Sequence, residues 1–168
     1  MAALYEGDQG DVHVILTRRS AALRVHSGEV SFPGGGQEAG EALADTARRE
    51  AREEIGLDPT LVELIGELDH LSTITSDSFI VPYVGVLPGK PSLTPSPAEV
   101  ESVLHVPLAE LFRADVYREE RWELFGRERS IHFFELEGDT VWGATASMLR
   151  QLLGLVTGTV ARGELDHG

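Results

Sequence analysis

The segment that most constrains the fold lies between residues 31 and 56, where a glycine-rich loop precedes a helix that carries clustered glutamates. Proline and glycine break both regular periods, so residues 31–36 are predicted to form a loop. Apolar residues recur every four positions at 43, 47, 51 and 55, which predicts a helix from about Glu41 to Ile55. Gly56 favours the end of this helix, and Pro59 prevents its continuation.

Three glutamates share one side of the predicted helix. At about 100° per residue, Glu53 lies about 60° to one side of Glu50 and Glu54 about 40° to the other. Like charges at these spacings repel by about a few tenths of a kcal/mol per pair, and a divalent cation would reverse that interaction. Mg²⁺ and Mn²⁺ prefer such oxygen ligands. Alone, the cluster is more typical of a solvated face on which Arg49 pairs with Glu53.

The glycine loop changes the balance between these two interpretations. Gly34 and Gly35 let backbone approach a ligand closely, so we expect both to contact phosphate and Gly35 also to contact the metal. Loop and carboxylates together indicate a site for a metal-bound polyphosphate. The metal would activate a water, and a further carboxylate would accept its proton. Glu99 is a candidate for that base or for an extra metal ligand, and it equally suits a solvated loop position.

Composition excludes several function classes. The chain has 14 Lys and Arg against 28 Asp and Glu, a formal charge of −14, which disfavours nucleic acids and anionic membranes as partners. It contains no cysteine, so thiolate ligands, disulfides and a cysteine nucleophile are excluded. No apolar run reaches the length of a membrane span and no signal peptide opens the sequence. We therefore expect a cytoplasmic protein with a small-molecule substrate; no motif indicates an oligomeric state.

One window departs from this acidic character. No Asp or Glu occurs between Asp11 and Glu29, and the window contains three arginines and two histidines. A basic segment in an acidic chain indicates a local anion site. The alternative is that Arg19 and Arg24 pair with surface carboxylates of the protein itself.

The remaining pattern predicts one domain over residues 1–168, of the α/β (α+β) class. Strands are expected at 12–17 (half-buried), 61–68, 79–87 and 131–136, with Pro82 marking an edge or a bulge. Helices are expected at 107–112 and 144–156, and a frayed tail after Gly158. Trp122 and Phe125 fall in a predicted charged loop, where they would stack on adenine or pack in the core. The irregular alternation of strands and helices predicts a mixed sheet covered by helices on both faces.

The spacing of Gly35, Glu41 and the run Arg49-Glu50-Ala51-Arg52-Glu53-Glu54-Ile55-Gly56-Leu57 resembles the Nudix box, here residues 35–57. Ala51 departs from the larger aliphatic residue usual in that family. The resemblance implies an α/β/α sandwich with a mixed sheet between helices. It also implies that Glu50, Glu53 and Glu54 bind Mg²⁺ or Mn²⁺, while Glu41 and Arg49 brace the loop against the helix.

A second resemblance covers residues 15–35. Ile15-Leu16-Thr17-Arg18-Arg19-Ser20, then Arg24, Gly28 and Phe32-Pro33-Gly34-Gly35, are similar to the motif of the coenzyme A pyrophosphatase subgroup, with Ile15 in place of the usual Leu. Residues 100–108 and 141–146 also resemble subgroup blocks, whereas the N-terminus and residues 76–79 depart from them. The resemblance implies hydrolysis of coenzyme A, its thioesters or its oxidised forms to 3′,5′-ADP and 4′-phosphopantetheine or its derivative. Arg19 and Arg24 would hold phosphates that the metal does not.

Two alternatives remain at the level of sequence. The first is the same chemistry on another nucleoside diphosphate derivative such as ADP-ribose. A proline downstream of the box is frequent in such enzymes, but none occurs here between Pro59 and Pro82. The second is a non-catalytic binding module, which would tend to lose box glutamates that this chain retains.

Overall fold

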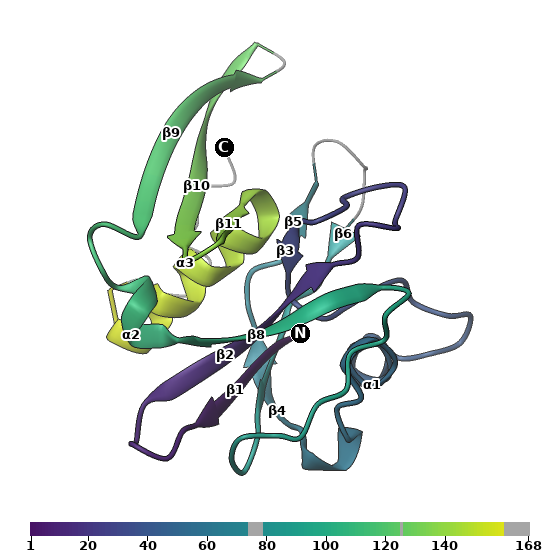
Figure 1. The fold of residues 1–168 in the computed structure, drawn as a ribbon. Helices are drawn as coiled ribbons and strands as arrows, with labels where there is room; N and C mark the ends of the chain where they lie inside the picture. The colour runs from purple at the N-terminus through teal and green to yellow at the C-terminus, as the bar shows by residue number, and fades with distance from the viewer. Residues whose placement is uncertain (74–78, 125, 160–168) are drawn as a thin grey trace.

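The computed structural model describes residues 1–73, 79–124 and 126–159 (Figure 1). Its helices are α1 (Leu43–Ile55), the 3-10 turn η1 (Pro59–Leu61), α2 (Leu108–Leu111) and α3 (Gly143–Thr157). Its strands are β1 (Ala2–Glu6), β2 (Val12–Arg19), β3 (Val30–Ser31), β4 (Glu63–Glu67), β5 (Leu71–Ser72), β6 (Phe79–Ile80), β7 (Tyr83–Val86), β8 (Val100–Pro107), β9 (Tyr117–Leu124), β10 (Arg127–Leu136) and β11 (Asp139–Trp142).

The central sheet is mixed and is organised around β2. Its order is β3-β2-β1-β7-β4, and β8 pairs with the opposite side of β2. Strands β1 and β7 run parallel, and the other pairings are antiparallel. Because β1 pairs with β2 only as far as Ile15 and β3 pairs at Thr17 and Arg18, β3 follows β1 along the same edge of β2. Two smaller sheets, β11-β10-β9 and β5-β6, complete the fold.

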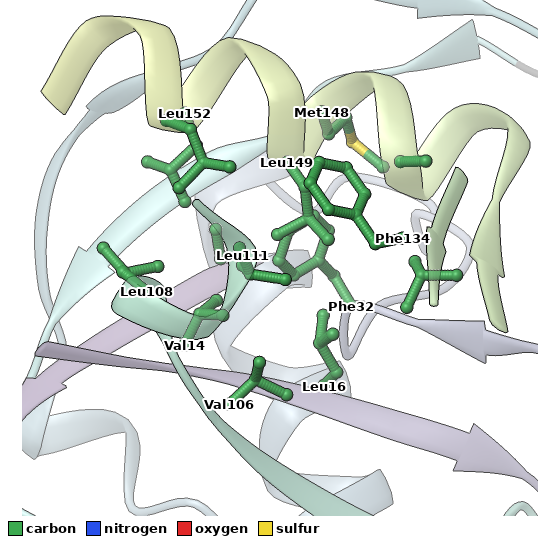
Figure 2. Packing of buried hydrophobic residues seen from close by; sticks show 14 of the residues in the cluster. Val14, Leu16, Phe32, Val106, Leu108, Leu111, Phe134, Met148, Leu149 and Leu152 are labelled. Atoms are coloured by element: carbon green, nitrogen blue, oxygen red, sulfur yellow. The ribbon is translucent and has the colours of Figure 1, made fainter. Parts of the chain in front are cut away.

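Helices cover both faces of the central sheet, as the sequence predicted. Val14 and Leu16 belong to the cluster that contains Leu149 and Leu152 of α3 (Figure 2). Ile15, between them, belongs to the second cluster, which contains three residues of α1: Ala47, Ala51 and Ile55. Successive side chains of a strand point to opposite faces, so β2 is buried on both sides. The prediction of a half-buried strand was therefore wrong.

Several predicted boundaries differ from the structure. The region 61–68 begins with the turn η1, and the region 79–87 is divided at Pro82, which lies just before β7 and outside its ladder. Trp122 lies in β9 and not in a loop. Strands β1, β3, β5, β8, β9 and β11 were not predicted. Phe125, residues 76–78 and the tail from residue 160 lie outside the described residues.

Helix α1 begins at Leu43, two residues after the predicted start, because Glu41 belongs to the preceding loop and bonds back to it. The helix ends as predicted at Gly56, whose φ of 68° is left-handed and whose N–H bonds the carbonyls of Ala51 and Arg52. A Cβ on Gly56 would lie 3.2 Å from the carbonyl oxygen of Thr94. The proline-rich segment 90–97 therefore packs directly against the end of the glutamate helix.

Candidate active site

The glycine loop lies against the glutamate face of α1. The Gly34 N–H donates to Glu54 Oε2 at 3.0 Å. A Cβ on Gly35 would lie 2.5 Å from Glu50 Cδ, so only glycine leaves room for that carboxylate. From the other side, the main-chain nitrogen of Met1 donates to the Pro33 carbonyl at 2.5 Å. The start of β1 and the helix thus hold the loop between them.

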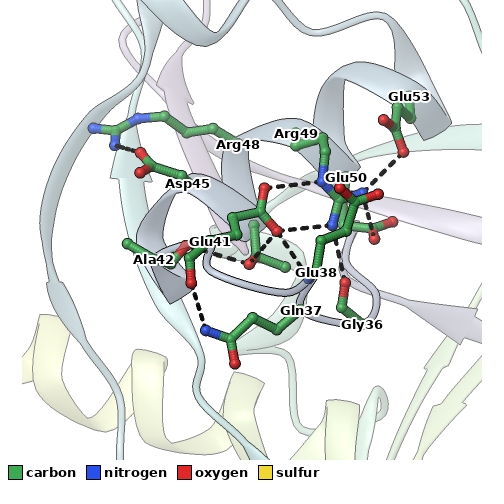
Figure 3. Close-up of polar contacts among 11 residues, drawn as sticks. Gly36, Gln37, Glu38, Glu41, Ala42, Asp45, Arg48, Arg49, Glu50 and Glu53 are labelled. Carbon is green, nitrogen blue, oxygen red and sulfur yellow. Dashed lines mark hydrogen bonds and ion pairs between the residues drawn. The ribbon is translucent and has the colours of Figure 1, made fainter.

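Arg49 and Glu41 brace this arrangement (Figure 3). Arg49 Nε donates to Glu41 Oε1 at 2.9 Å, and its Nη2 donates to Glu41 Oε2 at 3.1 Å and to the Gly36 carbonyl at 2.9 Å. Glu41 Oε2 also accepts from Thr46 Oγ1 at 2.7 Å and from the Glu38 N–H at 3.2 Å. Hydrogen bonds from Arg49 and Thr46 lower the pKa of Glu41 to about 2. These contacts agree with the bracing role that the resemblance implied.

Glu54 is a buried carboxylate that is only weakly paired with a cation. Its side chain is 5% exposed, and Arg19 Nη1 lies 4.0 Å from Oε1. Burial raises its pKa to about 7, and the charges of Glu50 and Glu99 act in the same direction. The Gly34 N–H and Arg19 oppose this shift without cancelling it. A carboxylate in this position is under-neutralised, which favours a cation beside it.

The other two box glutamates are bridged by the brace. Arg49 Nη1 donates to Glu50 Oε1 at 2.9 Å and to Glu53 Oε2 at 3.0 Å. Glu53 is 55% exposed, and its carboxylate lies nearest the solvent. Across residues 1–73, 79–124 and 126–159, no three His, Asp or Glu side chains are gathered closely enough to coordinate one ion. The donor set nevertheless suits a hard divalent cation, because Glu54 and Glu50 offer carboxylate oxygens beside the open backbone of Gly35.

Glu99 is placed near these carboxylates by main-chain contacts. The Thr94 and Ser96 N–H groups donate to the carbonyls of Ile55 and Glu54 at the end of α1, both at 2.8 Å. The Glu99 carbonyl accepts from the Ser20 N–H at 2.8 Å. Glu99 is exposed, and its charge contributes to the raised pKa of Glu54. An exposed carboxylate close to the buried Glu54 is a suitable position for the predicted base.

The three arginines of the basic window have different environments. Arg18 makes a bidentate ion pair with Asp139, at 2.7 and 2.5 Å, and Asp139 is only 6% exposed. Arg19 lies on the opposite face, and its buried Nε has no partner in the described part of the chain. Arg24 is exposed in the loop after β2 and makes no ion pair or hydrogen bond to any described residue. Arg18 is therefore structural, whereas Arg19 and Arg24 retain free donors.

Sequence reasoning missed Asp139 as the partner of Arg18, and it missed Trp142. Trp142 was recognised only as part of the block 141–146. A buried ion pair across 121 residues leaves no local periodic signal. The ion pair joins β2 of the central sheet to β11 of the three-stranded sheet, and the sequence did not predict that these two sheets meet.

Comparison with known proteins identifies the family. Residues 1–141 match the NUDIX domain. The chain is 42% identical over 161 residues to Nudix hydrolase 22, chloroplastic, of Arabidopsis thaliana, covering 89% of this chain and 51% of that protein. Nudix hydrolase 15, mitochondrial, of the same plant is 41% identical, with 89% and 54% covered. NudL of Photorhabdus laumondii is 36% identical over 140 residues, with 83% and 74% covered. The chain thus spans about half the length of the two plant relatives.

Solved structures support the same fold. A Nudix hydrolase from M. smegmatis, RenU, superposes with a TM-score of 0.63 at 15% identity, covering 95% of this chain and 84% of that one. No helix in the described residues is long and apolar enough to cross a membrane. The names of the plant relatives refer to chloroplast and mitochondrion, so the expected cytoplasmic location stays a prediction. The family match and the relatives together show that this chain belongs to the Nudix hydrolase family.

Proposed function

We propose that this protein hydrolyses the pyrophosphate bond of coenzyme A and its derivatives in a reaction that depends on Mg²⁺ or Mn²⁺. The observation that carries the hydrolase assignment is the buried, under-neutralised Glu54, which lies beside Glu50 under the Gly34–Gly35 backbone. The products would be 3′,5′-ADP and 4′-phosphopantetheine or its acylated or oxidised form.

Each residue has a defined part in this proposal. Glu50, Glu53 and Glu54 would hold the metal, with Gly35 contributing from the backbone. When bound, the cation would neutralise phosphate charge and lower the pKa of the attacking water. Glu99, exposed and close enough to Glu54 for its charge to act on it, would accept the proton. Arg49 would have to release Glu53 or Glu50 in part, while its bonds to Glu41 keep the helix and loop together.

Coenzyme A as the substrate is supported by the basic window and its resemblance to the subgroup motif. Coenzyme A carries a pyrophosphate and a separate 3′-phosphate, so its recognition requires cationic groups beyond the metal. Arg19 approaches Glu54 and has an unpartnered Nε, and Arg24 is exposed without an ion pair to a described residue. Gly34 and Gly35 would receive the phosphates between these arginines and the metal.

The hydrolase assignment is tested with Glu54→Gln and Glu50→Gln, which remove charge and retain shape. We expect kcat to fall at least about a hundredfold for each, the usual scale for an electrostatic group at the reacting centre. Glu63→Gln, on the exposed face of β4, is the matched control and should retain activity. Full activity of both site variants, or of the wild type in EDTA, would exclude the proposal.

The substrate is tested by comparing kcat/KM for coenzyme A, dephospho-coenzyme A, ADP-ribose and diadenosine tetraphosphate under one metal condition. Loss of a charge-assisted contact to the 3′-phosphate should make dephospho-coenzyme A about ten- to a hundredfold poorer. Arg19→Ala or Arg24→Ala should reduce that difference. A tenfold higher kcat/KM for ADP-ribose would show that coenzyme A is the wrong substrate and favour another nucleoside diphosphate derivative. The hydrolase assignment would remain intact.

A further inference from the structure

The outer face of the three-stranded sheet β9-β10-β11 carries an aromatic stripe. Phe133 pairs with Trp142 across β10 and β11, and its ring centroid lies 6.0 Å from that of Trp122 on β9. The neighbouring residues Phe134 and Val141 point the other way, into the core with α3. An outward face of such a sheet is usually polar. Here Trp122 and Trp142 remain 38% and 42% exposed.

This stripe forms one wall of a cleft of about 660 Å³. Residues 27–29, which lead into β3, and the Arg18–Asp139 ion pair also line it. The cleft is shallow and open to solvent, so it suits one flat group of a ligand and would not enclose a whole ligand. Figure 1 shows the β9–β10 hairpin and β11 on the side of the central sheet away from α1.

The polar groups of the cleft disfavour an anion and favour a neutral planar group. Among the described residues that line it, Arg18 is the only cation, and it is already neutralised by Asp139. The Arg118 guanidinium, 3.8 Å over the Phe133 ring, is paired with Glu120 and Glu135. Glu29 is bound to His26 through Oε2 at 3.0 Å, and its carboxylate can accept a further hydrogen bond. The Trp142 N–H makes no hydrogen bond to any described residue, so it remains available as a donor. A purine base offers a π-face for two indoles, an amino donor and ring-nitrogen acceptors.

The cleft wall is directly connected to the candidate active site. Arg19 N–H donates to the Glu29 carbonyl at 2.9 Å, and Gly28 N–H donates to the Arg19 carbonyl at 3.2 Å. The main chain of the wall therefore lies about 5 Å from that of Arg19, the spacing of paired strands. A Cβ on Gly28 would meet nothing within 4 Å, so no neighbouring group covers this glycine on that side.

We infer that this cleft holds the adenine base of the substrate, stacked on Trp122 and Trp142, while its phosphates reach around the β3 edge to Arg19 and the carboxylates. The inference rests on the proposed function, because the adenine bound in the cleft would belong to the same coenzyme A molecule whose phosphates bind at the candidate active site. Stacking contributes affinity without strong dependence on the rest of the ligand. The base would then anchor coenzyme A independently of the metal.

The experiment uses the intrinsic fluorescence of the protein. The chain has two tryptophans, and both line the cleft. We would titrate the protein with 3′,5′-ADP in EDTA, exciting at the red edge of the tryptophan band, where adenine does not absorb. Saturable quenching is expected. Ribose 5-phosphate, which lacks the base, and 4′-phosphopantetheine should not quench at the same concentrations.

Variants then assign the signal to the stripe. Trp142→Leu and Trp122→Leu each leave one tryptophan as the reporter, and each should weaken 3′,5′-ADP binding about five- to 150-fold. The same factor should appear mainly in KM for coenzyme A. Trp142→Phe retains an aromatic face and should restore most of the affinity. Phe112→Leu, an exposed aromatic outside the cleft, should leave affinity and KM unchanged.

The outcomes separate this inference from the proposed function. Hydrolysis of coenzyme A without quenching by 3′,5′-ADP, or quenching by 4′-phosphopantetheine instead, would overturn the inference alone. Tryptophan emission that depends on protein concentration and not on nucleotide would assign the stripe to self-association and overturn it too. Quenching that the leucine variants weaken, in a protein that hydrolyses no coenzyme A, would support the cleft and remove the proposed function.

Discussion

Gly35→Ala is the most informative single change at the candidate site. Its Cβ would lie 2.5 Å from Glu50 Cδ and Oε2 and 2.6 Å from Oε1. Non-bonded carbon atoms prefer about 3.5–4.0 Å, so the Glu50 carboxylate must move by about 1 Å. That carboxylate is the end of a flexible side chain, and Gly35 is not among the residues with positive φ. The strain is therefore relieved at Glu50 and not in the backbone.

The substitution should separate activity from stability. A misplacement of about 1 Å at a catalytic group costs about a hundredfold in rate, so we expect kcat/KM to fall by about that factor, with weaker Mn²⁺ binding. Glycine to alanine in an accessible conformation stabilises a protein by about 0.4–1 kcal/mol through the unfolded state. This gain should offset most of the disturbance at the Glu50–Arg49 contact, so the free energy of unfolding should change by less than about 1 kcal/mol.

Gly36→Ala is the matched control, since its Cβ would meet nothing within 4 Å and its φ is not positive. We would measure steady-state kinetics, Mn²⁺ affinity by calorimetry and unfolding in urea for the wild type and both variants. Gly36→Ala should behave as the wild type in kinetics and metal binding. Full activity of Gly35→Ala with unchanged Mn²⁺ affinity would refute the placement of Glu50 at the metal site.

Two further predictions concern charge. Burial raises the pKa of Glu54 from 4.5 to about 7. Without metal, the folded protein therefore binds this proton more tightly than the unfolded chain does, and protonation of Glu54 stabilises the fold. This stabilisation is complete below pH 4.5 and is lost as the pH rises through 7. Glu54 alone should therefore lower the free energy of unfolding in EDTA by up to about 3 kcal/mol between pH 4.5 and 8. Glu54→Gln should remove this part of the pH dependence. The same dependence of unfolding free energy on pH in the wild type and in Glu54→Gln would contradict the prediction. Arg18→Ala should destabilise the protein by about 3–5 kcal/mol, because it leaves the buried Asp139 unpaired, whereas Arg24→Ala should cost less than about 0.5 kcal/mol. Urea unfolding of both variants tests this contrast, and equal losses would show that the ion pair contributes little.

The local parts of the fold were predictable because their causes are local. The glycine loop, the period of α1 and its end at Gly56 follow from backbone conformation and from spacing along a few turns. The arc of Glu50, Glu53 and Glu54 follows from helix geometry alone. The sheet covered on both faces was also predicted, from the alternation of element types. The loop, the helix and the arc depend on residues that are neighbours in the sequence.

Strand pairing was decided by the tertiary structure. Strand β9 alternates poorly and is rich in charged residues, so its sequence reads as a loop, and its pairing with β10 makes it a strand. Strand β2 reads as half-buried, although α1 and α3 cover its two faces. Propensity along the chain carries no information on which surfaces later meet.

The sequence by itself determined the Nudix box, the glycine loop and the presence of arginines before it. Only the tertiary structure decided how these groups divide their roles. It buried Glu54 and raised its pKa, left Glu53 near solvent, and assigned Arg18 to Asp139 while Arg19 faces the carboxylates. Two adjacent arginines on a strand point to opposite faces, and each face is covered by a segment distant in the sequence: α1 lies on the Arg19 side, and Asp139, 121 residues away, binds Arg18 on the other.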